Sequence, residues 1–176
     1  NKIIELLKNV DASKIEFDEN SKFISLPDDI KIDLGGIAKG YTSDKIMKIY
    51  EKYNVTAGIV SLGGNVQAYN TKPDGTLWKV GIENPDDANS YLGVISVKDK
   101  AVITSGGYER YFEEDGITYH HILDPDTGYP AESGLKSVTI VSENGILADG
   151  LSTSLFVMGK EKALIYWRKN CDKFDM

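Results

Sequence analysis

The chain has 176 residues, of which 41% are hydrophobic and 27% charged, a balance typical of a folded protein. Its net charge of −7 argues against nucleic-acid binding, which usually needs a clustered basic surface. A single cysteine, Cys171, excludes an internal disulfide and a cysteine-built metal site. No apolar run approaches the roughly 20 residues that a membrane-spanning helix needs. We therefore expect a single domain over 1–176 that meets any anionic ligand locally, through amides, a few cations or a metal.

The predicted elements put helices toward the two ends of the chain and strands between them. A short helix is expected over 1–9, a hairpin over 15–25, a strand over 31–34 and a helix over 38–53. Strands follow over 57–62, 66–70, 77–82, 91–97, 101–105, 108–113, 117–122 and 136–142, and helices over 145–158 and 161–169. This order predicts an α+β fold, in which helices pack on a mostly antiparallel sheet.

Three glycine pairs end predicted strands, at 35–36, 63–64 and 106–107. Lys39 follows the first pair at the start of a helix, and Ser105 precedes the third. Glycines let a backbone approach a ligand closely, and amides at a helix start attract anions. Each pair taken alone is best explained as a bulge or tight turn, and both the Walker spacing and GxGxxG are absent. Together the pairs can surround an extended polyanion.

The two histidines of the chain are adjacent, at His120 and His121, and an Asp-Pro turn follows at Asp124. Neighbouring residues of a strand point to opposite faces, so at most one of the two histidines faces a given site. We expect His120 to be a partly exposed strand residue. His121 and Asp124 are candidates for acid/base chemistry or for ligand contacts. A calcium loop is excluded, because Tyr129 and Leu135 occupy the positions that need Gly and Glu.

Asp149 lies inside an apolar helical segment, and Thr153 follows it one turn later on the same face. A carboxylate in such a segment is costly unless it is paired. It can be a capping or hydrogen-bonded aspartate, which is common. Alternatively, the two side chains are hard oxygen ligands at one-turn spacing, which suit magnesium better than zinc. Magnesium bound there would allow an acidic protein to hold an anionic substrate.

Five segments together resemble the ApbE-type flavin transferases (FAD:protein FMN transferases), once described as thiamine-biosynthesis lipoproteins. They are spread over residues 32–159, in the order found in the family: IDLGGIAKGY at 32–41, VSLGGNV at 60–66, ITSGGYERYF at 103–112, HHILDPDTGYP at 120–130 and ADGLSTSLFVMG at 148–159. The resemblance implies an ApbE-like, T-fold-like architecture. It further implies that residues 1–176 are the C-terminal catalytic portion of a longer protein.

The same resemblance implies magnesium-dependent transfer of FMN from FAD to a threonine of a target protein, with release of AMP. The implied metal ligands are Asp149, Thr153 and the Gly36 carbonyl, and His121 and Asp149 are the implied catalytic residues. Contacts with FAD are implied for Asp33, Lys39, Gly63, Gly64, Ser105, Gly106, Leu123 and Asp124.

The implied partners are FAD and an acceptor subunit of a redox complex. Family habit also implies an extracytoplasmic location, with a lipid anchor on the full-length protein that is absent from this sequence. Two alternatives remain open at this point. One is an FAD pyrophosphatase giving FMN and AMP, in which water replaces the acceptor. The other is a binding module that holds FAD without turnover.

Overall fold

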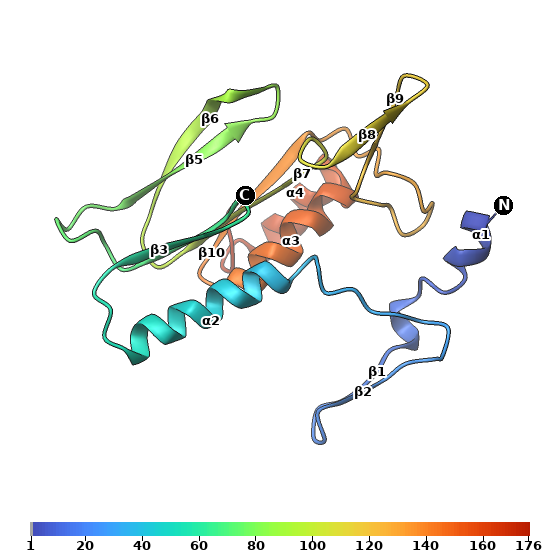
Figure 1. Cartoon of the computed structure of the whole chain (residues 1–176), viewed down its shortest axis with the longest axis horizontal. Helices are drawn as coiled ribbons and strands as arrows, with labels where there is room; N and C mark the ends of the chain where they lie inside the picture. The colour runs from blue at the N-terminus through green and yellow to red at the C-terminus, as the bar shows by residue number, and fades with distance from the viewer. Residues whose placement is uncertain (1) are drawn as a thin grey trace.

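A four-stranded antiparallel sheet forms the middle layer of the computed structural model, which describes residues 2–176 (Figure 1). Its strands lie in the spatial order β10 (Ser137–Ser142), β7 (Ala101–Gly106), β4 (Asn65–Tyr69) and β3 (Gly58–Leu62). Strand side chains alternate between the two faces of a sheet, so each face needs its own apolar cover. In β7, Ala101 and Ile103 belong to one buried cluster and Val102 to another.

Helices cover one face of this sheet. Helix α3 (Gly145–Met158) packs on β7 and β10, and it also packs against α2 (Ala38–Lys52) and α4 (Lys160–Asn170). The core between these layers contains Ile103 and Ile140 from the sheet and Leu155 and Phe156 from α3, all nearly or fully buried. Helix α3 therefore has protein on several sides.

A long hairpin covers the other face of the sheet. It consists of β5 (Trp78–Asn84) and β6 (Asp87–Val97), with its register interrupted near Glu83. Val80 and Val97 of the hairpin pack with Val102 and Val141 of the sheet. The protein is thus layered as hairpin, sheet and helices, in agreement with the predicted α+β class (Figure 1).

Two smaller hairpins lie outside these layers. One joins β8 (Tyr111–Glu114) to β9 (Ile117–His120). The other joins β1 (Glu16–Asp18) to β2 (Phe23–Ser25), after α1 (Lys2–Leu7) and a single 3-10 turn over Ala12–Lys14. The segment before α2 extends away from the layered body in Figure 1.

Most of the expected elements are confirmed, and α3 has the predicted bounds. The predicted strand over 31–34 is wrong. These residues are exposed and pair with no strand, and Asp33 Oδ1 accepts the Gly35 N–H at 2.6 Å, which turns the chain instead of extending it. Strands β8 and β9 are shorter than predicted, and the residues next to them, Glu109, Arg110, His121 and Ile122, line a cavity. Among residues 2–176, no helix combines the length and apolarity needed to cross a membrane.

Candidate functional site

A cavity of about 670 Å³ opens where segments far apart in the sequence meet. The turn that enters α2, the β3–β4 turn, the end of β7, the residues after β9 and one face of α3 all contribute to its wall. The lining residues are Asp33, Gly35, Gly36, Ala38, Lys39, Gly63, Thr104, Ser105, Gly106, Glu109, Arg110, His121, Ile122, Leu123, Asp149 and Thr153. All three predicted glycine pairs therefore contribute at least one residue to this wall.

Asp149 is the buried acid of the cavity, with only 4% of its surface exposed. Its Oδ2 accepts the backbone N–H of Gly40 at 2.8 Å, and its Oδ1 accepts Nδ2 of Asn65 at 2.9 Å. Both donors are neutral, and within residues 2–176 the ion pairs of the structure do not include Asp149. Each oxygen can accept more than one hydrogen bond, so the carboxylate keeps lone pairs for a ligand.

Thr153 lies one turn after Asp149 on α3 and is partly buried. Its Oγ1 is 3.0 Å from Oγ of Ser105, which ends β7, and Ser105 Oγ is 2.7 Å from Oγ of Ser152. Ser152 is fully buried and donates to the Asp149 carbonyl at 2.9 Å. These hydroxyl contacts connect the end of β7 to α3, the helix that carries Asp149.

Lys39 is the cation at the start of α2, and its Nζ donates to the Gly63 carbonyl at 3.3 Å. Gly63 and Gly64 have φ values of +54° and +88° and connect the paired residues Leu62 and Asn65. A two-residue hairpin turn with both φ values positive strongly favours glycine. The second glycine pair therefore forms a tight turn, and Gly63 also lines the cavity.

His121 is exposed at the cavity, and its Nδ1 lies 3.2 Å from the backbone carbonyl of Arg110. A carbonyl oxygen only accepts hydrogen bonds, so this contact puts a proton on Nδ1. In the neutral ring, Nε2 then carries the free lone pair. Arg110, whose backbone carbonyl orients His121, also lines the cavity and adds a second cation to its wall.

The predicted separation of the two histidines is confirmed. His120 lines a different cavity, of about 440 Å³, together with Tyr108 and Phe156. Its ring packs edge-on against Phe156, and its buried Nδ1 has no hydrogen-bond partner among the described residues. Burial of Tyr108, with Glu109 and Glu83 adding repulsion, raises the pKa of its hydroxyl above the usual value.

Two residues expected to contact FAD lie outside the lining set. Asp124 forms a turn, where its Oδ1 accepts the Asp126 N–H at 2.7 Å and its carbonyl accepts the Gly128 N–H at 2.8 Å. Gly64 is the second residue of the β3–β4 turn, and the wall at that turn is formed by Gly63. The other expected contacts, Asp33, Lys39, Ser105, Gly106 and Leu123, all line the cavity.

Sequence reasoning overlooked Asn65 and Arg110 as site residues. Asn65 is 1% exposed, and its side-chain amide donates to Asp149. In the sequence it is a polar residue at the start of a strand, and nothing there indicates which residue it contacts. Only the folded chain brings it beside Asp149. Arg110 was part of a recognised motif, and a basic residue beside a glycine turn was the signal that could have found it.

The residues of the cavity fit a hard cation. Within residues 2–176 there is no cluster of three or more His, Cys, Asp or Glu side chains, so a cation would depend on Asp149 with hydroxyl and carbonyl oxygens. Thr153 and Gly36 supply such oxygens on the same wall. Magnesium takes few protein ligands and completes its shell with water and phosphate. A buried carboxylate with neutral partners provides the charge that would attract it.

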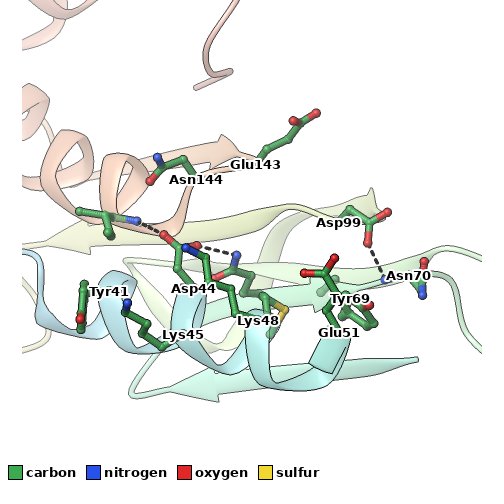
Figure 2. A pocket seen from close by; sticks show the side chains of 14 residues that line it. Tyr41, Asp44, Lys45, Lys48, Glu51, Tyr69, Asn70, Asp99, Glu143 and Asn144 are labelled. Atoms are coloured by element: carbon green, nitrogen blue, oxygen red, sulfur yellow. Dashed lines mark hydrogen bonds between the residues drawn. The ribbon is translucent and has the colours of Figure 1, made fainter. Parts of the chain in front are cut away.

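Another cavity, of about 640 Å³, lies between α2, the end of β4 and the start of α3. Figure 2 shows Asp44 at its centre, with Lys45, Lys48 and Glu51 along the same helix. The predicted site residues do not line it. Asp44 accepts Nε2 of Gln67 and the N–H of Gly145, both at 2.9 Å, and the N–H of Ile146 at 3.0 Å. These bonds give Asp44 a structural role at the start of α3.

Comparison with known proteins shows the family to which the chain belongs. The ApbE family model matches residues 1–176, and the chain belongs to the ApbE family. It is 40% identical over 149 residues to the FAD:protein FMN transferase of Treponema pallidum (strain Nichols), covering 80% of this chain and 41% of that protein. It is 36% identical over 166 residues to the FAD:protein FMN transferase of Haemophilus influenzae, covering 92% of this chain and 48% of that protein. The chain thus spans less than half the length of these curated relatives.

Solved structures have the same fold. The ApbE protein of Thermotoga maritima superposes with a TM-score of 0.89 at 40% identity, over 98% of this chain and 56% of that one. The flavinyl transferase ApbE of Pseudomonas stutzeri, in its apo form, superposes with a TM-score of 0.79 at 32% identity, over 94% of this chain and 50% of that one. The expected ApbE-like architecture is therefore confirmed.

Proposed function

We propose that this chain carries the reaction centre of an FAD:protein FMN transferase that depends on magnesium and modifies a threonine. The observation that supports this most is the cavity in which Asp149 is buried beside Thr153 and faces the glycine turns. The names of the relatives support flavin transfer to a protein. The metal and the threonine rest on the donor set of the cavity and on the resemblance of the motifs.

The pyrophosphate of FAD is the part of the substrate that this wall suits. Lys39 and Arg110 are the cations of the lining, and the turns at Gly36, Gly63 and Gly106 allow close backbone approach. Asp33, Glu109 and Asp149 are the acids. Because the acids offset the cations, phosphate binding at this wall calls for additional positive charge. Magnesium, when held by Asp149, Thr153 and the Gly36 carbonyl, would supply this charge and polarise the phosphate oxygens.

His121 is the proposed base for the acceptor hydroxyl. Its Nδ1 proton is directed at the Arg110 carbonyl, so Nε2 is the nitrogen free to take a proton. In the proposed reaction the threonine oxygen forms a bond to the FMN phosphorus, and the bond from that phosphorus to the bridging oxygen breaks. AMP leaves with the bridging oxygen, and the threonine proton goes to His121. Neither oxidation nor reduction occurs, and no further reactant is needed.

The test is to incubate the chain with FAD, Mg²⁺ and a protein that a relative flavinylates. We expect covalent FMN on one threonine of the acceptor and an equal amount of AMP. AMP formed at the same rate without acceptor would favour the hydrolase alternative, and tight FAD binding without AMP would favour the binding module. Asp149→Ala is expected to abolish transfer; retained transfer in that variant would rule out the metal assignment.

The expected extracytoplasmic location, with a lipid anchor on a longer protein, stays a prediction from the family resemblance. Fractionating cells that express the natural gene would test it. Recovery of the protein only in the cytoplasm would refute the prediction.

A further inference from the structure

Three hydroxyls beside the cavity form a chain with a fixed far end. Ser152 on α3 is fully buried, and its Oγ lies 2.9 Å from the backbone carbonyl of Asp149. Ser105 Oγ lies 2.7 Å from Ser152 Oγ and 3.0 Å from Thr153 Oγ1. The hydroxyl chain therefore runs from the backbone of one proposed metal ligand to the side chain of the other.

The direction of every proton in this chain follows from the carbonyl. A carbonyl oxygen accepts and never donates, so Ser152 uses its one proton on Asp149. Ser152 must then accept from Ser105. Ser105 has used its own proton, so it must accept from Thr153. Only this arrangement satisfies all three contacts at once.

We propose that Ser152 and Ser105 are positioning residues that make Thr153 present oxygen lone pairs, and no proton, to the cavity. The Thr153 proton is directed at Ser105, which leaves the lone pairs for the cavity that Thr153 lines with Asp149. A hard divalent cation needs such oxygens. If the proton pointed inward instead, the same hydroxyl would repel a cation. The inference rests on the proposed function only in taking the ligand of Thr153 to be a divalent cation.

Ser152 is the residue that isolates this effect. It does not line the cavity and cannot touch a bound ligand, whereas Ser105 lines the wall. In Ser152→Ala, Ser105 loses its acceptor and becomes free to donate to Thr153. The Thr153 proton is then free to turn into the cavity. Asp149 and Thr153 both remain in place, so any change in cation affinity comes from the direction of a proton.

The experiment measures Mn²⁺ affinity of the chain without FAD, by the loss of the free-ion paramagnetic resonance signal, with Mg²⁺ as competitor. Ser152→Ala is expected to weaken Mn²⁺ binding roughly 10- to 100-fold, the usual effect of removing a group that orients a metal ligand. Ser154→Ala is the matched control, because Ser154 Oγ makes a similar bond to the Gly150 carbonyl, at 2.7 Å, on the exposed side of the same helix. The control should bind Mn²⁺ like the unmodified chain.

A double variant distinguishes the effect of the hydroxyl chain Ser152–Ser105–Thr153, called the relay below, from a general loosening of α3. Thr153→Val removes the oxygen on which the relay acts, so adding Ser152→Ala to it should cost no further Mn²⁺ affinity. Additive losses would overturn the inference, as would a Ser152→Ala variant that binds Mn²⁺ normally. Thermal unfolding reports whether each variant folds; if Ser152→Ala does not, Ser105→Ala makes the same prediction, because it removes the acceptor of the Thr153 proton.

Failure of the relay is separable from failure of the proposed function. Absence of Mn²⁺ binding by the unmodified chain would overturn the relay, whatever the transfer assay gives. The predicted Mn²⁺ pattern without any FMN transfer would leave the relay standing and count against the transferase. FMN transfer by the unmodified chain, together with normal Mn²⁺ binding by Ser152→Ala, would overturn the relay and leave the transferase proposal standing.

Discussion

Asp44 and Asp149 cap each other's helices. Asp44 belongs to α2 and accepts the Gly145 and Ile146 amides that begin α3, at 2.9 and 3.0 Å. Asp149 belongs to α3 and accepts the Gly40 amide in the first turn of α2, at 2.8 Å. The first turn of a helix leaves N–H groups without intrahelical partners, and the side chain of Ile37 makes no capping bond to α2. Asp149, a proposed metal ligand, therefore also links α3 to α2.

Asp44→Ala separates stability from cation binding. The variant leaves two amides and the Gln67 side chain without an acceptor, so we expect a loss of about 1–3 kcal/mol in the free energy of unfolding. Asp44 does not line the predicted site, so Mn²⁺ affinity should change little. Urea denaturation and Mn²⁺ titration on the same preparation check both statements. A large loss of Mn²⁺ affinity with unchanged stability would contradict this division of roles.

Asn65→Leu tests how Asp149 is held. Leucine has nearly the shape of asparagine but no donor, so Oδ1 of Asp149 loses its bond from the Asn65 amide. We expect weaker Mn²⁺ binding, by roughly 10- to 100-fold, because the carboxylate is no longer fixed. Calorimetric titration of the two proteins gives the comparison, and an Asn65→Leu variant that binds Mn²⁺ as well as the unmodified chain would refute it.

Two glycine-to-alanine changes have opposite expected effects on stability. A Cβ at Gly40 would clash with the Gly145 carbonyl oxygen and lie 2.7 Å from Asp149 Cβ, so α2 and α3 would have to separate. We expect Gly40→Ala to lower the free energy of unfolding by about 1–3 kcal/mol.

Gly150 gives the matched control inside α3. A Cβ there meets only Ile37 Cγ2, at an ordinary 3.5 Å. Alanine is favoured over glycine in a helix interior by roughly 1 kcal/mol, so Gly150→Ala should raise the melting temperature. Differential scanning calorimetry of both variants decides the matter. A stabilised Gly40→Ala protein would show that the close crossing of the helices is not as described.

Local patterns were enough to predict most of the fold. An apolar stretch bounded by turn residues predicted α3 at its observed bounds, and alternation predicted the strands of the sheet. Residues 31–34 have a strand-like composition but no partner strand, since Asp33 turns the chain before one can pair. Pairing partners are a property of the tertiary structure, and this stretch of sequence does not encode them.

The site was predictable where motifs mark it and not where distant residues complete it. The turns around Gly36, Gly63 and Gly106 converge on one cavity, as three glycine pairs had suggested. Asn65 and Ser152 were missed because their roles come from contacts with Asp149 and Ser105. Such contacts join segments that local sequence patterns treat separately.

The most direct test of the central claim is mass spectrometry of an acceptor protein after incubation with this chain, FAD and Mg²⁺. We predict the added mass of one FMN on a threonine, one AMP released for each FMN attached, and loss of both products on chelation of the metal. His121→Ala should slow transfer without weakening Mn²⁺ binding, because His121 is the proposed base and not a metal ligand. FMN and AMP set free in equal amounts, with the acceptor unmodified, would contradict the account.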